Sequence, residues 1–173
     1  YSRALQGVAA LERIFNLFDA ENVIRDGDYK YPEGEKAAGQ ITFENVGFLY
    51  PDGYVALKNI NLSIEPGQTF AFVGRSGAGK TTIFNLLPRL FDATEGSIKL
   101  DGRDIREFTL SSLRDQISVV SQDSILLTGT ASENIAFGRP HATPQECSDA
   151  AKRAPADGFI RQLTERYDTV MYT

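Results

Sequence analysis

The chain has 173 residues, of which 42% are hydrophobic and 24% are charged. This composition excludes a collagen, a coiled coil and a largely disordered protein, and the length suits roughly one domain with its own buried core. The 18 Lys and Arg against 23 Asp and Glu give a net charge of −5. The sequence therefore lacks the basic excess that favours nucleic-acid binding, and we expect no nucleic-acid partner.

The sequence predicts neither a disulfide framework nor a membrane span. Cys147 is its one cysteine, which excludes an intramolecular disulfide and favours a reducing compartment. The longest runs without a charged residue, 66–74 and 124–132, are far shorter than the about 20 apolar residues of a transmembrane helix. The first residues show no signal-peptide pattern and no initiator methionine, so we expect a piece of a longer polypeptide.

Residues 1–39 predict an amphipathic helix followed by a linker. Over 4–18, apolar side chains recur at spacings of three and four, which favours a helix that docks through one face. These side chains are Leu5, Val8, Leu11, Phe15 and Phe18. A helix on a membrane surface is the alternative, which the few basic residues disfavour. Residues 19–39 are polar and glycine-rich, as in a linker.

Residues 40–122 alternate between strand and helix patterns. Period-two alternation over 41–46 and 59–64 predicts half-buried strands. The apolar run 69–73 is typical of a fully buried strand, and a helix should run from about Lys80 toward Pro88. Two further strands are expected over 97–100 and 117–120, with a turn at Asp101 and Gly102 after the first of them.

Residues 123–173 predict helices that begin at capping boxes. Thr130 with Glu133 forms one such pattern, and Thr143 with Glu146 forms another, with Pro144 at the first helical position. The second helix should stop before Pro155. A third helix can begin at Asp157.

A phosphate-binding loop stands between the predicted strand 69–73 and the helix that follows it. The segment GRSGAGKTT fits the pattern G-x-x-x-x-G-K-[ST]. Its glycines let backbone N–H groups curl toward phosphate oxygens, and the start of a helix adds positive potential. The residues expected to bind nucleotide here are Gly74, Arg75, Ser76, Gly77, Ala78, Gly79, Lys80, Thr81 and Thr82.

Two side chains of this loop carry the expected chemistry. Lys80 supplies an ammonium for the β- and γ-phosphates, and Thr81 offers a hydroxyl to Mg²⁺. The alternative is a glycine-rich turn that only starts a helix, which the flanking strand and helix disfavour. A phosphate loop alone does not choose among GTPases, kinases, helicases and transport ATPases.

Over residues 4–170 the chain resembles the nucleotide-binding domain of an ATP-binding cassette (ABC) exporter. The segments ITFENVGFLYP and ALKNINLSIEPGQTFAFVG resemble the family's antiparallel subdomain leading into the phosphate loop. EGSIKLDGRDIREFTLSSLRDQISVVSQD resembles the stretch up to the glutamine loop, and TASENIAFGRP with FIRQL and YDTV resembles the start of the helical subdomain. ALERIFNLFD resembles the link from the membrane-spanning part.

The resemblance implies an α/β fold, that of a P-loop NTPase with an ABC-type ATPase domain. It implies a linker from a membrane domain at 1–39, an antiparallel β subdomain with the phosphate-loop core at 40–122, and part of a helical subdomain at 123–173. The implied cofactors are ATP and Mg²⁺. The implied partners are the transporter's own transmembrane domain and a second nucleotide-binding domain, expected to be an identical copy in a homodimer, with a heterodimer as the alternative. The implied location is the cytoplasmic face of a plasma membrane or bacterial inner membrane.

The resemblance also assigns roles outside the phosphate loop. Tyr50 matches the aromatic residue that stacks on adenine, although a strand tyrosine packing a turn is the alternative. Gln122 matches the glutamine that reaches Mg²⁺ or orients the attacking water, and with Lys80 it completes the expected catalytic pair. Ile125, Leu126 and Leu127 would help form the groove for the membrane domain's coupling helix, or else belong to an ordinary core.

Three residues receive structural interpretations. His141 is expected in a solvated loop, Cys147 in helix packing, and Asp101 in a turn rather than in a metal site.

The sequence ends before features that the family carries further along. These are the serine-glycine-glycine signature, an apolar strand ending in Asp-Glu, and a switch histidine. We therefore expect a transport ATPase as the parent protein and a chain that binds nucleotide but hydrolyses ATP negligibly. Several strands of the parallel sheet would be missing too. The transported substrate is set elsewhere, so lipids, drugs and peptides all stay open.

Two alternatives remain. One is a catalytically inactive fragment that holds nucleotide weakly or serves only as structure. The other is a different phosphate-loop class, which is disfavoured because the sequence shows no Asn-Lys-x-Asp guanine-binding motif and no convincing arginine-rich lid.

Overall fold

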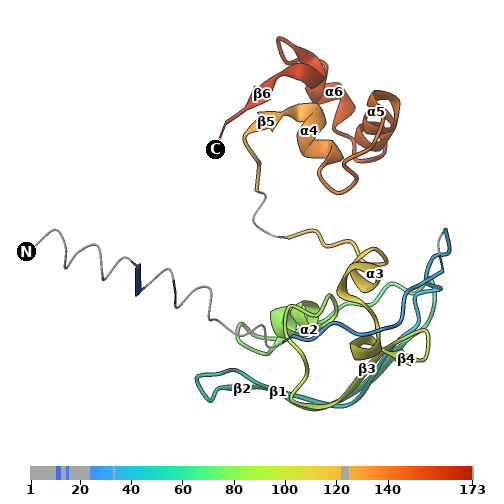
Figure 1. Cartoon of the computed structure of the whole chain (residues 1–173), viewed down its shortest axis with the longest axis vertical. Coiled ribbons are helices and arrows are strands. Elements are labelled where there is room, and N and C mark those ends of the chain that lie inside the picture. Colours follow the sequence, from blue (N-terminus) through green and yellow to red (C-terminus); the bar gives the residue numbers. More distant parts are fainter. Residues whose placement is uncertain (1–10, 13–14, 16–23, 33, 122–124, 173) are drawn as a thin grey trace, which may run out of the picture. The chain divides into compact units, whose positions relative to one another are not determined.

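The computed structural model describes residues 11–12, 15, 24–32, 34–121 and 125–172 (Figure 1). They fall into two compact units, Tyr1–Val119 and Val120–Thr173, each described here by itself. Leu11, Glu12 and Phe15 are helical. The rest of the predicted helix over 4–18 lies outside the described residues, as does the first part of the predicted linker.

The first unit is built on a four-stranded antiparallel sheet. Its strands are β1 (Ile41–Leu49), β2 (Val55–Ile64), β3 (Glu95–Leu100) and β4 (Arg103–Asp104), in the order β2-β1-β3-β4. In the register, Phe43 of β1 lies opposite Leu62 of β2 and Ile98 of β3. The strands predicted over 41–46, 59–64 and 97–100 are therefore confirmed, and β1, β2 and β3 are each longer than predicted.

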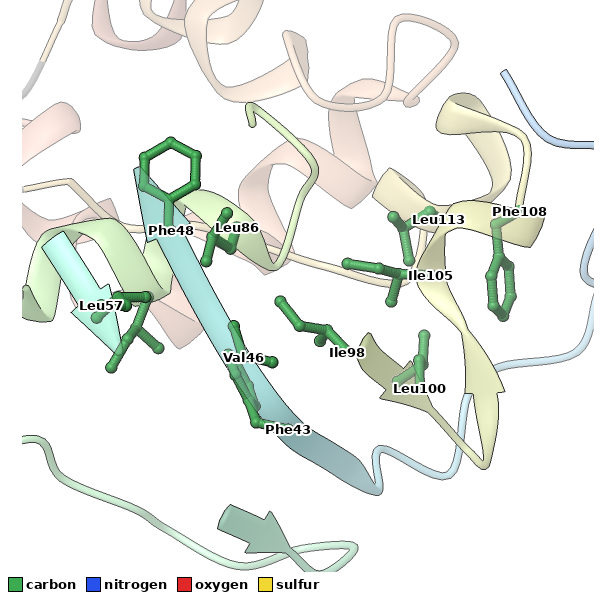
Figure 2. Close-up of a cluster of buried hydrophobic side chains, with 11 residues drawn as sticks. Phe43, Val46, Phe48, Leu57, Leu86, Ile98, Leu100, Ile105, Phe108 and Leu113 are labelled. Atoms are coloured by element: carbon green, nitrogen blue, oxygen red, sulfur yellow. The ribbon is translucent and has the colours of Figure 1, made fainter. Parts of the chain in front are cut away.

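One hydrophobic core joins this sheet to the helices of the unit. The helices are α2 (Lys80–Leu86), the 3₁₀ helix η1 (Ile105–Glu107) and α3 (Leu110–Arg114). Figure 2 shows side chains from the strands and the helices converging on one cluster. Its buried members are Phe43, Val46, Phe48, Leu57, Ile83, Leu86, Ile98, Leu100, Ile105, Phe108 and Leu113.

The described part of the predicted linker is held along this unit by polar contacts. The N–H of Gly27 donates to the Phe108 carbonyl at 3.1 Å, and that of Tyr29 donates to the Glu107 carbonyl at 2.8 Å. Asp101 accepts hydrogen bonds from the Tyr31 hydroxyl at 2.6 Å and from the backbone N–H groups of residues 38–40. Asp101 thus anchors the linker beside its turn, and the expectation of a structural role is confirmed.

A buried arginine, Arg89, also binds the predicted linker. Arg89 is 2% exposed, pairs with Asp92 at 2.7 Å and donates to the Arg25 carbonyl at 2.9 Å. The ion pair satisfies the buried charge, and the bond to Arg25 couples the linker to the end of α2.

Two predicted strands are wrong. Residues 69–73 and 117–120 have no assigned strand structure in the described chain. Val73 is 95% exposed, where a buried strand was expected, and Val120, in the other predicted strand, is 99% exposed. The physical reason is that a strand exists only as part of a ladder. Both runs have the right residues, but no described segment pairs with either of them.

The second unit is mainly helical. It contains β5 (Gly129–Thr130), α4 (Ala131–Ala136), α5 (Pro144–Arg153), α6 (Asp157–Ile160), the 3₁₀ helix η2 (Arg166–Asp168) and β6 (Val170–Met171). Both predicted capping boxes are formed, Thr130 with Glu133 and Thr143 with Glu146. α5 ends before Pro155 and α6 begins at Asp157, as predicted.

Cys147 is buried at 2% exposure and His141 is exposed, which confirms both structural interpretations. No helix in the described part of the chain is long and apolar enough to cross a membrane.

Candidate functional site

The phosphate loop has the backbone shape that its glycines predict. Gly77 and Gly79 adopt φ values of 80° and 81°, in the left-handed region that glycine alone enters freely. The N–H of Ala78 donates to the Arg75 carbonyl at 3.2 Å and closes the turn between them. The sequence-predicted residues 74–79 therefore form one curled loop directly before α2.

Gly79 also seats the loop on the sheet. A Cβ at this position would lie 2.7 Å from the Ala56 carbonyl oxygen and 2.7 Å from Cδ2 of Leu57. Both neighbours belong to β2, and Leu57 is part of the core. Only a residue without a side chain permits this approach, so β2 holds the loop at the start of α2.

Lys80 bridges the two sides of the loop. Its Nζ donates to the Gly74 carbonyl at 2.8 Å and to the Arg75 carbonyl at 2.7 Å. An ammonium has three N–H donors, so one is left for a ligand. The arrangement holds a positive charge over the loop at the N-terminal end of α2, where an anion is favoured.

The first turn of α2 adds further donors. The N–H of Ile83 makes the first helical hydrogen bond, to the Gly79 carbonyl at 3.0 Å. The N–H groups of Lys80, Thr81 and Thr82 precede that bond, at the open end of the helix. Thr81 is exposed, so its hydroxyl can reach a metal ion held by phosphates.

Thr82 differs from Thr81 because its side chain faces inward. It is 5% exposed, and its Oγ1 lies 3.0 Å from the Tyr50 hydroxyl. The hydroxyl of Thr82 thus holds Tyr50, and the backbone N–H is the group of Thr82 placed to meet a phosphate.

Tyr50 lies directly after β1, beside the start of α2. Its ring meets Phe48 edge-on at 4.8 Å between centroids and Phe91 edge-on at 5.8 Å. These contacts, with the bond to Thr82, fix a half-buried ring next to the phosphate loop. The structure therefore brings Tyr50 together with residues 74–82.

Sequence reasoning overlooked Tyr54, which touches both parts of this site. Its hydroxyl donates to the Gly77 carbonyl at 3.3 Å, and its ring lies 6.3 Å from that of Tyr50. The sequence feature that could have indicated Tyr54 is the turn at Pro51, Asp52 and Gly53, because this turn folds the chain back toward Tyr50.

Two further expectations fall elsewhere. Gln122 lies outside the described residues, so its predicted role at the metal and the water stays a prediction. Ile125, Leu126 and Leu127 are all exposed in the second unit. They do not form its core, and the groove that they were expected to line remains a prediction.

The donor groups of residues 74–82 suit a nucleoside triphosphate better than a metal ion held only by protein ligands. Residues 74–82 supply backbone N–H groups, an ammonium and one exposed hydroxyl. Among the residues that the structure describes, no group of His, Cys, Asp or Glu could hold a metal ion. Mg²⁺ commonly keeps several waters and binds through substrate phosphates, so the Thr81 hydroxyl is a suitable protein ligand.

Comparison with known proteins agrees with the resemblance to ABC exporters. The family model for the ABC transporter matches residues 57–171. The chain is 44% identical over 168 residues to an ATP-dependent lipid A-core flippase of Hahella chejuensis (strain KCTC 2396), covering 96% of the chain and 28% of the flippase. It is 48% identical over 157 residues to a putative multidrug export ATP-binding/permease protein of Staphylococcus aureus (strain NCTC 8325 / PS 47), covering 90% and 27%.

A solved structure shows the same similarity in three dimensions. A bacterial Atm1-family ABC exporter with ATP bound matches with a TM-score of 0.84 at 38% identity, over 95% of the chain and 29% of the exporter. The chain therefore spans less than a third of the length of each of these relatives.

Proposed function

The chain belongs to the ABC transporter family, and we propose that it is the ATP-binding part of an exporter's motor domain. In this role, ATP binding and hydrolysis drive the movement of a substrate across a membrane. The observation that carries the proposal is the phosphate loop seated on β2, with Lys80 bridging the Gly74 and Arg75 carbonyls. The fold is that of the ABC ATPase, with its antiparallel N-terminal subdomain.

Each part of the site has a proposed task in binding. The loop N–H groups and the third N–H of Lys80 bind the phosphates, where pre-placed donors stabilise charge without reorganising. Tyr50 stacks on adenine, and Thr81 is the proposed protein ligand of Mg²⁺. The bound ion would neutralise the charge that develops on the phosphates. Gln122 is proposed to orient the attacking water or reach the ion.

The proposed partners follow from the relatives. The names of these relatives join ATP binding to a permease or describe an exporter. We propose that a membrane-spanning part adjoins this chain, that a second nucleotide-binding domain faces it, and that it works on the cytoplasmic side of the membrane. Lipid A-core flipping and multidrug export are activities in the relatives' names, and either substrate class is open for this chain.

We further propose that these 173 residues alone hydrolyse ATP negligibly. Hydrolysis needs a group that polarises the attacking water, and the sequence contains no apolar run followed by Asp-Glu. Phosphate release from Mg-ATP, measured with the purified chain, should equal the release in buffer. Turnover that disappears in Lys80→Ala would contradict this part of the proposal.

The same preparation separates the proposal from its alternative. A chain that binds Mg-ATP without turnover supports a nucleotide-binding part of a larger ATPase. A chain that melts cooperatively yet binds no Mg-ATP would instead be a structural fragment.

A further inference from the structure

Tyr54 is held in place by a closed hairpin loop between β1 and β2. The Tyr50 N–H donates to the Tyr54 carbonyl at 2.9 Å, and the Gly53 N–H donates to the Tyr50 carbonyl at 2.9 Å. Asp52 accepts the Tyr54 N–H at 3.0 Å. Three hydrogen bonds within five residues fix the backbone here, so the Tyr54 side chain starts from a defined point.

From that point the side chain reaches two parts of the candidate site. Its hydroxyl donates to the Gly77 carbonyl at 3.3 Å. Its ring lies 6.3 Å from the Tyr50 ring, with 25° between the planes. Yet Tyr54 is 54% exposed. It is therefore an accessible aromatic side chain beside both the stacking ring and the phosphate loop.

We infer that Tyr54 is a further nucleotide-binding residue, which flanks the bound nucleotide between its base and its phosphates. This inference rests on the proposed function, since it takes the phosphates to residues 74–80 and the base to Tyr50. A nucleotide that spans those two places passes beside Tyr54, which contacts both. An aromatic face accepts any base or sugar surface, and it gains more by covering a ligand than by facing water.

The hydroxyl of Tyr54 has a separate task in this arrangement. The peptide between Gly77 and Ala78 is held at both ends, its carbonyl by Tyr54 and its N–H by the Arg75 carbonyl at 3.2 Å. Fixing this peptide keeps the loop curled before ligand arrives, which lowers the cost of ordering it on binding. The ring thus serves the nucleoside, and the hydroxyl serves the phosphate loop.

Two ligands separate these tasks, Mg-ATP and Mg-tripolyphosphate, because the second has no base or sugar. Calorimetric titrations would use the chain with Tyr54→Leu, which removes both functions, and Tyr54→Phe, which removes only the hydroxyl. We expect Tyr54→Leu to weaken Mg-ATP about tenfold and Mg-tripolyphosphate about twofold. Tyr54→Phe should weaken both ligands about twofold. Tyr172→Leu, at a 79% exposed tyrosine of the second unit, is the matched control and should change neither affinity.

A spectroscopic variant makes the test independent of affinity. The chain has no tryptophan, so Tyr54→Trp introduces a single reporter that keeps an aromatic ring. Its emission should change on adding Mg-ATP and not on adding Mg-tripolyphosphate. The emission of Tyr172→Trp should respond to neither ligand.

The outcomes distinguish this inference from the proposed function. If the wild type binds Mg-ATP and loses binding in Lys80→Ala, while Tyr54→Leu binds normally and Tyr54→Trp is silent, the inference is overturned and the function stands. A cooperatively melting wild type that binds no nucleotide overturns both. Equal weakening of the two ligands in Tyr54→Leu would also overturn the inference, since it would leave only a role in holding the loop.

Discussion

The antiparallel sheet and the two apolar runs 69–73 and 117–120 contain similar strand-forming residues, but only the segments of the sheet form strands. β1 finds partners on both sides, β2 and β3, and its side chains Phe43 and Val46 are fully buried. The apolar runs find no ladder among the described residues, and Val73 at the end of one is 95% exposed. Strand-forming residues are thus a condition for a strand, and the partner decides whether it forms.

This difference also distinguishes the two sides of the phosphate loop in the candidate site. The side of the phosphate loop that leads into α2 is held by Gly79 against β2. The side that enters from 69–73 has no strand partner in the described chain, and its support comes from Phe72, which packs against the core and lies edge-on to Phe84 of α2 with 5.6 Å between ring centroids. Lys80 connects the two, because its ammonium binds the carbonyls of Gly74 and Arg75 on the entering side.

The largest expected effect is a difference in the free energy of unfolding between a substitution in the paired sheet and one in the unpaired run 69–73. Ile98 is 2% exposed in β3, so Ile98→Ala should lower the free energy of unfolding by about 3 kcal/mol through lost burial and a cavity. Val73→Ala should change it by less than about 0.5 kcal/mol. Urea denaturation of both variants measures the difference. A cost above about 1 kcal/mol for Val73→Ala would mean that the Val73 side chain is buried after all.

The next effect sharpens the comparison within the loop. Gly79→Ala should cost about 3 kcal/mol, because the new Cβ would meet β2 and φ is 81°. Gly77→Ala should cost only about 1 kcal/mol, since its φ is similar but a Cβ there meets nothing within 4 Å. Denaturation and Mg-ATP titration of both variants give the result. Equal costs would show that backbone strain alone, rather than seating on β2, governs the loop.

A smaller effect is expected at the linker. Burial by itself would raise the pKa of Asp101, but hydrogen bonds from the Tyr31 hydroxyl and three backbone N–H groups outweigh it and lower this pKa. The stabilisation is therefore present above the carboxyl's ordinary pKa and is lost as pH falls through the lowered value. Asp101→Asn should cost about 2 kcal/mol at pH 7.

Hydrogen exchange tests this anchor directly. The amides of Ala38, Gly39 and Gln40 donate to Asp101. Their protection in the wild type should be complete above the carboxyl's ordinary pKa of 3.8 and should decrease as pH falls below it, and it should be low throughout in Asp101→Asn. Unchanged protection in the variant would mean that the linker is held without this carboxylate.

The smallest effect concerns the other partner of Asp101. This partner is Tyr31, whose hydroxyl donates to the Asp101 carboxylate. That hydrogen bond, followed by burial and by the charge of Asp101, raises the pKa of Tyr31 to about 12. Because the folded value lies above the ordinary value of 10.0, this contribution is complete below pH 10 and is lost as pH rises through 12. Tyr31→Phe should cost about 1 kcal/mol.

The ultraviolet absorbance of tyrosinate measures this titration. Subtracting the curve of Tyr31→Phe from that of the wild type should leave a single step near pH 12. In Asp101→Asn the same step should move toward lower pH. A step near pH 10 in the wild type would show that the bond between Tyr31 and Asp101 is not formed.

The sequence predicted the features whose contacts are local. Both capping boxes join residues three apart, and the phosphate loop is one continuous segment, so pattern and structure agree there. The strands 41–46 and 59–64 were also predictable, because alternating side chains show which face is buried.

Contacts between distant segments were not predictable from the sequence. Tyr54 reaches Gly77, and Arg89 reaches Arg25, across long stretches of chain. The two wrong strands failed for the same reason, since a ladder depends on a partner that the run itself does not encode. Tyr50 was identified through its family resemblance, whereas its bond to Thr82 was visible only in the structure.

The most direct test of the central claim is a calorimetric titration of Mg-ATP into the purified chain and into Lys80→Ala. If the loop held by β2 and bridged by Lys80 is organised within these residues, the wild type should give saturable heat and the variant should give none. Equal binding by both proteins, or no binding by a wild type that melts cooperatively, would contradict the account.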